Sequence, residues 1–141
     1  MQKIQFFFLD RKPVLKDRKR LKRFIENLFS QENRELGNLS YIFCSDKHLL
    51  GMNKDFLKHD FYTDVITFDL GTPKKAIEGE VYMSVDRIRD NASKLGVSFR
   101  EEFHRVIFHG ALHLCGYKDK KKPDQQRMRL AENRYLEAYF S

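Results

Sequence analysis

Three residues near the end of this sequence have the types and spacing of a metal site. His109 and His113 are four residues apart in the segment HGALHLCGYKD, and on a helix that spacing points both imidazoles from the same face. Asp119 comes six residues after His113, where a continuing helix would carry it off that face. Gly116 allows a left-handed turn that ends the helix and brings the Asp119 carboxylate back to the same ion. Three protein ligands that leave one position open are typical of a catalytic zinc site.

An ordinary structural role for these residues is the alternative. In that case His109 and His113 are core histidines, and Asp119 is one more charge in the solvated run KDKKK. We favour the metal, because the histidine pair, the Gly116 turn and a third ligand occur together on a helix that is otherwise apolar. Zn²⁺ is the expected ion, although other divalent transition metals accept the same ligands. The spacing is that of HExxH zinc proteases, but Gly110 replaces their catalytic Glu, so hydrolysis of a phosphodiester fits better than hydrolysis of a peptide.

The charge balance favours a polyanionic partner. The chain has 27 Lys and Arg against 20 Asp and Glu, a formal net charge of +7, and such an excess attracts nucleic acid. Many basic proteins merely carry solvated charges, so composition alone leaves both interpretations open. The candidate phosphate contacts lie in a basic helical stripe and in the run around the end of the metal motif: Lys16, Lys19, Arg20, Arg23, Lys118, Lys120, Lys121 and Lys122.

The cysteines and the N-terminal segment indicate the compartment. Cys44 and Cys115 are too few for a disulfide framework and suit a reduced cytoplasm. Cys115 lies off the ligand face of its helix and is expected to be a packed thiol. The apolar run in MQKIQFFFLD is too short for a signal peptide or a membrane span, so we expect neither export nor membrane insertion.

The apolar periodicity predicts one α+β domain over residues 1–141, with a small mixed sheet of about four strands, about five helices and the metal site on a buried helix. Strands are predicted at residues 3–8, 39–45, 64–70 and 80–85, the second and third of them largely buried. Helices are predicted at residues 16–31, 48–57, 86–95 and 99–115, and from about residue 123 onward. Ser98 and Glu101 match a capping box, and His104 is expected on the helix surface.

The sequence resembles the YbeY-type family of bacterial rRNA maturation factors along most of its length. The resemblance rests on TDVITF at 63–68, GEVYMSVD at 79–86 and above all HGALHLCGYKD at 109–119. It implies a cytoplasmic metal-dependent endoribonuclease, specific for single strands, that acts in rRNA maturation at the 3′ end of 16S rRNA and in ribosome quality control. It also implies rRNA or a ribosomal subunit as the partner, with no role for DNA. The family usually has a third His where this chain has Asp119, a replacement that keeps a metal-capable side chain and adds negative charge.

A second departure from the family pattern concerns the substrate. Leu57 stands where family members commonly carry an Arg that is important for activity. Lys58 or His59 is expected to supply the missing charge, and His59 is the one side chain considered for catalysis beside a metal-activated water. The resemblance also makes Thr63 and Asp64 candidates for RNA binding, because they begin a strand beside the metal cleft in the family, although Thr-Asp equally suits an ordinary strand-entry turn.

Two other functions stay open at the level of sequence. The first is an RNA-binding ribosome-assembly factor whose metal is structural, which Leu57 favours. The second is a metal hydrolase of another substrate, including a peptide, which Gly110 disfavours.

Overall fold

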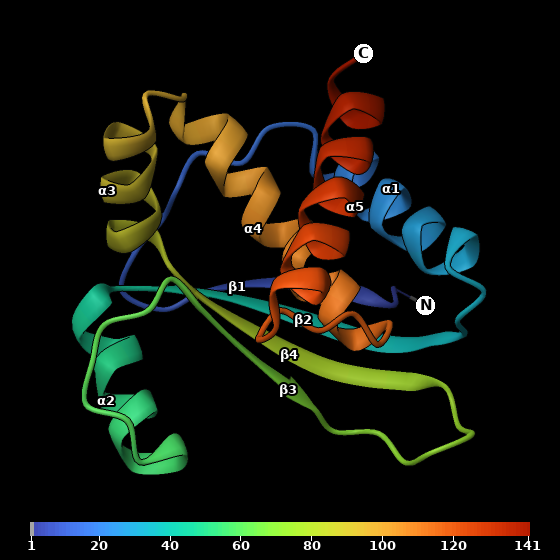
Figure 1. Cartoon of the computed structure of the whole chain (residues 1–141), viewed down its shortest axis with the longest axis horizontal. Coiled ribbons are helices and arrows are strands. Elements are labelled where there is room, and N and C mark those ends of the chain that lie inside the picture. The colour runs from blue at the N-terminus through green and yellow to red at the C-terminus, as the bar shows by residue number, and fades with distance from the viewer. Residues whose placement is uncertain (1) are drawn as a thin grey trace.

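A four-stranded mixed sheet forms the centre of the structure, a computed structural model that describes residues 2–141 (Figure 1). Its strands are β1 (Ile4–Phe8), β2 (Leu36–Cys44), β3 (Val65–Asp69) and β4 (Ile77–Ser84). Their order is β1-β2-β4-β3, with β1, β2 and β4 parallel and β3 antiparallel to β4 at one edge. The helices are α1 (Arg18–Gln31), α2 (Asp46–Leu57), α3 (Val85–Leu95), α4 (Phe99–Leu114) and α5 (Lys122–Phe140). The predicted α+β architecture is confirmed.

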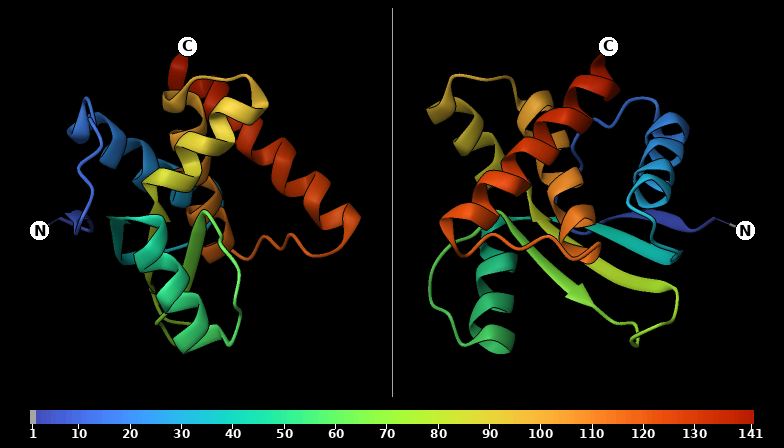
Figure 2. Two further views of the ribbon diagram at one scale, coloured as in Figure 1. Left: turned by 90° about the vertical axis from the view of Figure 1, so that its left-hand side faces the viewer. Right: turned by 45° about the vertical axis from the view of Figure 1, so that its right-hand side comes forward.

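The helices divide unequally between the two faces of the sheet. Figures 1 and 2 show α1, α3, α4 and α5 on one face and α2 on the other. Alternate residues of β2 point to the two faces, as the strand period requires: Phe43 joins the main core beneath α4, whereas Cys44 packs with Leu49 of α2 and Ile66 of β3. The main core therefore lies on the α4 side, and the partly buried His109 and His113 of α4 lie at its border.

Two glycines let α4 pack closely against β4. A Cβ atom on Gly110 would lie 2.8 Å from Cγ1 of Val81, and one on Gly79 would lie 2.7 Å from Cδ1 of Leu114. Real Cβ atoms do not approach so closely, so helix and strand can touch only because both side chains are absent. Gly110 thus has a packing role at the position where zinc proteases carry their catalytic Glu. This contact fixes the C-terminal half of α4 beside the sheet edge formed by β3.

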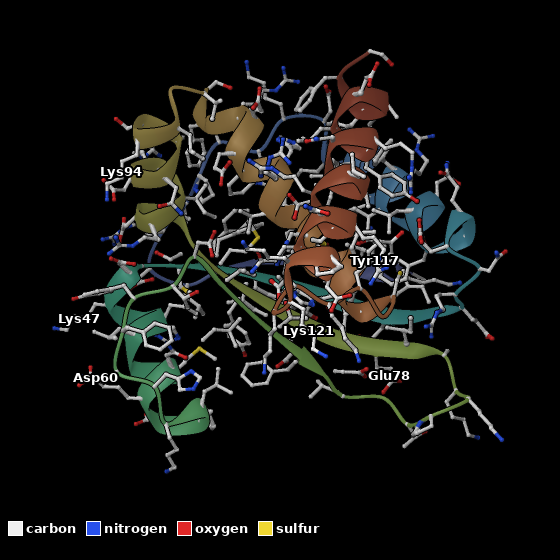
Figure 3. The ribbon with its side chains drawn as sticks, in the orientation of Figure 1. Lys47, Asp60, Glu78, Lys94, Tyr117 and Lys121 are labelled. Carbon is white, nitrogen blue, oxygen red and sulfur yellow. The ribbon has the colours of Figure 1, made fainter. Side chains whose placement is uncertain are left out.

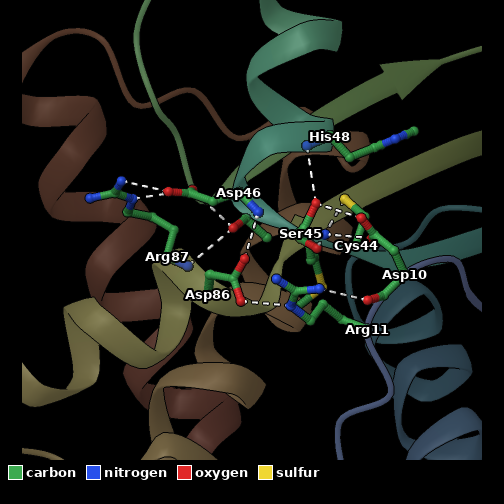
Figure 4. A network of polar contacts seen from close by, with 10 residues as sticks. Asp10, Arg11, Cys44, Ser45, Asp46, His48, Asp86 and Arg87 are labelled. Carbon is green, nitrogen blue, oxygen red and sulfur yellow. Dashed lines mark hydrogen bonds and ion pairs between the residues drawn. The ribbon is translucent and has the colours of Figure 1, made fainter.

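A polar network joins the starts of α2 and α3, beyond the ends of the parallel strands β2 and β4 (Figure 4). Ser45 caps α2 by accepting from the His48 N–H group, and Ser84 caps α3 in the same way. The Asp46 carboxylate accepts hydrogen bonds from the Ser84 hydroxyl at 3.1 Å and from the Arg87 guanidinium at 2.7 Å. The network holds the start of α2 against the strand ends and against the start of α3.

Several sequence predictions need correction in detail. Helix α1 begins at Arg18 rather than residue 16, because Asp17 has a left-handed backbone with φ of 53°. Strand β3 is an edge strand in which Ile66 alone is buried, so the prediction that it is largely buried was wrong. His104 is only 6% exposed, not a surface residue, because α5 packs over it and its ring stacks on Tyr139. Of the capping box, the structure forms the half in which Ser98 Oγ accepts from the Glu101 N–H group.

The prediction for Cys115 is confirmed, since its side chain is buried. Over residues 2–141, the helices are too short or too polar to cross a lipid bilayer.

Candidate metal centre

The side chains of His109, His113 and Asp119 meet beside the C-terminal end of α4. Oδ2 of Asp119 lies 3.2 Å from Nε2 of His113 and 3.4 Å from Nε2 of His109. One ligand atom from each of the three residues lies within 4.8 Å of the other two. Two imidazole nitrogens and a carboxylate oxygen around one point are a ligand set for zinc and related divalent metals. The structure therefore brings together the three residues that the sequence motif singled out.

A Schellman turn at the end of α4 returns Asp119 to the histidines. Gly116 has a φ of 106°, the left-handed region that favours glycine. Its N–H group donates to the His113 carbonyl, and the N–H group of Tyr117 donates to the Leu112 carbonyl, both at 3.0 Å. The helix stops and the chain reverses, as the position of Gly116 predicted. Figure 3 labels Tyr117 and Lys121 in the loop that then leads to α5.

Hydrogen bonds at Nδ1 orient both histidine ligands. Nδ1 of His109 lies 2.6 Å from Oε2 of Glu132, and Nδ1 of His113 lies 2.9 Å from the Tyr117 carbonyl oxygen. Both partners are acceptors, so each Nδ1 carries a proton, and each Nε2 is the nitrogen left for a metal ion. Both Nε2 atoms face Asp119. Imidazoles that ligate a metal are commonly held in this way, with one nitrogen on the ion and the other on a carboxylate or carbonyl.

Glu132 of α5 sets the electrostatics of the site. Burial by itself favours the neutral acid, but hydrogen bonds from His109 and Arg105 outweigh burial and lower the pKa of Glu132. Burial likewise opposes protonation of His109, yet the hydrogen bond and the charge of Glu132, with those of Asp119 and Asp64, raise its pKa. The negative charge that raises this pKa also attracts a metal cation, so metal and proton compete for His109 Nε2.

A second set of contacts ties the loop after α4 to α1. The Tyr117 hydroxyl donates to Oε1 of Glu32 at 3.0 Å, and the Tyr135 hydroxyl of α5 donates to Oε2 at 2.5 Å. The Arg134 guanidinium lies 3.4 Å from the same carboxylate. Glu32 is the residue that ends α1. One carboxylate thus joins α1, α5 and the loop that carries Asp119.

The metal residues lie in a cleft of about 840 Å³ between α4, β3, the start of α5 and the segment after α2. Asp64 and Glu102 are two further carboxyls in this cleft, and burial raises the pKa of each. The sequence-predicted residues that line the cleft are Leu57, His59, Thr63, Asp64, His109, His113, Asp119 and Lys120. The lining residues that sequence analysis missed include Glu102, Arg105, Arg129 and Glu132. Glu102 and Arg105 lie on the same helical stripe as His109 and His113, so their spacing could have predicted that they line the cleft. Glu132 lies on another helix, and no spacing in the sequence relates it to the histidines.

The basic stripe predicted for the first helix lies away from the cleft. Lys16 precedes α1, and Lys19, Arg20 and Arg23 belong to α1, which packs against β2 and α4 rather than β3. The Arg20 guanidinium lies 4.1 Å from the centre of the Tyr139 ring and donates to the Tyr139 carbonyl. Lys58 is exposed at the end of α2 and lies outside the cleft lining. A role for these side chains in RNA binding stays a prediction for a substrate that extends beyond the cleft.

Comparisons with known proteins agree with this geometry. A family model described as "Endoribonuclease YbeY" matches residues 9–140. The protein named Endoribonuclease YbeY from Cytophaga hutchinsonii is 44% identical over 133 residues, which cover 94% of this chain and 93% of that protein. The protein of the same name from Porphyromonas gingivalis is 44% identical over 114 residues, 81% of this chain and 75% of the relative. The solution structure of TM1509 from Thermotoga maritima is similar with a TM-score of 0.66 at 26% identity, covering 96% of this chain and 89% of that one.

Proposed function

The chain belongs to the YbeY endoribonuclease family, and on that premise we propose that it is a metal-dependent endoribonuclease that cleaves single-stranded RNA during rRNA maturation. We place its action at the 3′ end of 16S rRNA and in ribosome quality control, in the cytoplasm, with rRNA or a ribosomal subunit as its partner. One observation carries the proposal: His109, His113 and Asp119 converge in a cleft while the Nδ1 atoms of both histidines are already engaged.

The donor set fits one Zn²⁺ ion. Two imidazole nitrogens and a carboxylate oxygen are the ligands of a catalytic zinc site with an open position. Mg²⁺ and Ca²⁺ prefer oxygen ligands, so the histidine pair favours a transition metal over either of them. Asp119 in place of a third imidazole adds a negative charge, which other divalent transition metals also tolerate. When bound, the ion supplies Lewis-acid activation of water and of a phosphoryl oxygen.

Residues of the chain itself position the ligands and handle protons in the cleft. Glu132 fixes the orientation of His109, and the Tyr117 carbonyl fixes that of His113. Asp64 lines the same cleft, and burial raises the pKa of its carboxyl, which favours the protonated form. We assign it to exchange a proton with the attacking water or the departing oxygen. We assign Lys120 and Arg129, which border the cleft, to the RNA phosphates.

An RNA-binding assembly factor with a structural metal is the second candidate. The observation in its favour is that Leu57 lines the cleft at the position where family members commonly carry an Arg. A cleft without that cation would hold RNA with less stabilisation of the charge that develops on the reacting phosphate.

Cleavage and binding of the same RNA, measured side by side, separate the two candidates. A labelled single-stranded rRNA fragment is incubated with the zinc-loaded protein and with a His113→Ala variant purified identically. We expect the wild-type protein to cut the RNA and the variant to bind it without cutting. Binding by both proteins with cleavage by neither would support the assembly factor. Equal cleavage by both would show that the activity comes from a contaminating nuclease or from another site.

A further inference from the structure

We propose that the rings of His59 and Phe61 form a stacking platform for one unpaired base of the RNA substrate. The two residues lie in the segment that joins α2 to β3 and line the same cleft as the metal residues. The proposal rests on the proposed function, because it names the part of an RNA strand that this cleft recognises next to the reacting phosphate.

The two rings are exposed and already stacked on each other. Their centroids are 5.1 Å apart and their planes are inclined by 21°. Phe61 is 56% exposed, and Leu57, which continues the same wall of the cleft, is 41% exposed. Apolar surface of this kind in a concave site beside a metal centre is typical of a ligand contact rather than of a folding core.

A buried side chain holds the segment in place. Asn53 is only 1% exposed. Its backbone carbonyl oxygen accepts a hydrogen bond from the His59 N–H group at 3.0 Å, and its side-chain amide donates to the Phe61 backbone carbonyl at 2.8 Å. An ion pair of 3.3 Å between Lys54 and Asp60 lies beside these bonds. Asn53 therefore fixes the backbone on both sides of the turn, so the segment that carries the two rings is in place at the cleft before any ligand binds.

Two cations of the cleft lining are available to an RNA backbone. Lys120 belongs to the α4–α5 loop, and Arg129 belongs to α5, where its guanidinium lies 3.5 Å from Glu132. An aromatic surface for a base, combined with cations for the backbone, is the chemistry by which proteins bind single strands. A base in a duplex is stacked on its neighbours and paired, so it cannot reach such a surface without being extruded. The platform thus supplies a physical reason for a preference for single strands.

Leu57 has a consistent role in this arrangement. Its exposed side chain adds apolar surface to the same cleft lining as the rings. An apolar contact with a base is less sensitive to salt than a contact with a phosphate.

A double-mutant cycle between the protein and the RNA tests the platform. The probe is a fluorescein-labelled single-stranded oligoribonucleotide, together with copies that each lack one base, and affinity is measured by fluorescence anisotropy in EDTA so that metal-dependent cleavage is suppressed. We expect Phe61→Ala to weaken binding of the intact RNA by about tenfold, within the range reported for loss of one stacked base. One abasic RNA should bind the wild-type protein equally weakly, and Phe61→Ala should weaken its binding no further. Phe61→Trp should retain the affinity.

Tyr62 provides the matched control. It lies on the same segment and is 52% exposed, but it lies outside the cleft lining and contacts the Arg87 guanidinium, which is 4.9 Å from its ring centre. Tyr62→Ala should bind the intact RNA within about twofold of the wild-type protein. The platform is refuted if Phe61→Ala and Tyr62→Ala change the RNA affinity alike. It is also refuted if Phe61→Ala weakens the binding of every abasic RNA as much as it weakens the binding of the intact RNA. In either case the rings serve another occupant, such as an apolar peptide.

Failure of the platform and failure of the proposed function give different results. If the zinc-loaded wild-type protein cleaves RNA but the cycle shows no coupling between Phe61 and a base, the platform fails and the endoribonuclease stands. If the coupling is present but no RNA is cleaved, the cleft is a binding site for single strands and the endoribonuclease fails.

Discussion

Oε2 of Glu132 lies 2.6 Å from Nδ1 of His109, and this contact joins a carboxylate of α5 to a candidate metal ligand of α4. The same carboxylate binds Arg105 at 3.0 Å through its other oxygen. Glu132 is therefore held from two sides, and its geometry leaves His109 one orientation in which Nε2 faces Asp119. The metal centre depends on the packing of α5 against α4 as well as on the three ligands themselves.

The Glu132→Gln variant should bind zinc more weakly. An amide is a weaker acceptor than a carboxylate, so His109 should be held less firmly and its imidazole should be less basic. Changes of this kind cost about 10- to 100-fold in metal affinity. The measurement is the zinc dissociation constant by competition with a chelator. Glu137→Gln, an exposed change on the same helix, is the control and should have no effect. An unchanged dissociation constant for Glu132→Gln would show that His109 needs no support from α5.

The Tyr117→Phe variant should lose both stability and metal affinity. It removes the hydrogen bond to Glu32 but keeps the backbone carbonyl that accepts from His113. Loss of one hydrogen bond to a charged acceptor costs about 1.5 to 3 kcal/mol in the free energy of unfolding. Because the bond anchors the loop that carries Asp119, zinc affinity should also fall.

Tyr135→Phe separates these two effects, since it removes the other hydroxyl that donates to Glu32 but lies on α5 rather than on the loop. It should lower the free energy of unfolding, measured by urea denaturation, without a comparable loss of zinc affinity. Equal losses of zinc affinity in both variants would contradict a specific role for the Tyr117 anchor.

The Gly110→Ala variant should destabilise the protein although alanine favours helix. The new Cβ would lie 2.8 Å from Val81, so α4 must move away from β4, and overpacking of this kind costs about 1 to 3 kcal/mol. Gly51→Ala is the control, because a Cβ on Gly51 in α2 meets no atom within 4 Å and the change should be neutral or stabilise by up to about 1 kcal/mol. The free energy of unfolding in urea measures both. Rescue of Gly110→Ala by Val81→Ala would confirm the contact, and equal effects of the two glycine changes would contradict it.

Burial of His104 should make the stability depend on pH. Burial holds the pKa of His104 below its usual 6.5, although its hydrogen bond with the Arg100 carbonyl opposes the shift. As pH falls, His104 therefore gains its proton in the unfolded chain before it does so in the folded protein. Its contribution to the free energy of unfolding is complete above about pH 6.5 and is lost as pH falls toward the lower pKa of the folded state. Between about pH 7 and about pH 5, the free energy of unfolding should fall more for the wild-type protein than for His104→Phe, by up to about 1.4 kcal/mol per pH unit.

The exposed His48 provides the control for that measurement, since His48→Phe makes the same replacement on the protein surface. It should leave the pH dependence of unfolding as in the wild-type protein. The same pH dependence in His104→Phe as in the wild-type protein would contradict the assignment to His104.

The features that sequence predicted are those encoded over a few residues. The i, i+4 spacing of His109 and His113, and Gly116 as a helix stop, correctly predicted that both imidazoles and Asp119 meet, because helix geometry and the left-handed turn are local properties. The alternation of apolar residues located all four strands of the described chain, but it could not show that β3 is an edge strand, because strand order depends on contacts between distant segments.

The features that sequence missed depend on tertiary packing. His104 has the local setting of a surface residue and becomes buried only when α5 covers it. Glu132 lies 23 residues from His109, and Glu32 lies 85 residues from Tyr117, so neither contact leaves a local pattern in the chain. The stacking of His59 on Phe61 was missed. The sequence suggested His59 as a source of charge and as a catalytic side chain, but no local pattern shows that the two rings meet in the cleft.

The most direct test of the account is a zinc titration of the metal-free protein, followed by cleavage of a single-stranded rRNA fragment. The metal-free protein should be inactive, activity should rise linearly with added zinc and level off at one equivalent, and an Asp119→Ala variant should need far more zinc to reach its plateau. Full cleavage by the metal-free protein, or an identical titration curve for Asp119→Ala, would contradict a single catalytic ion held by His109, His113 and Asp119.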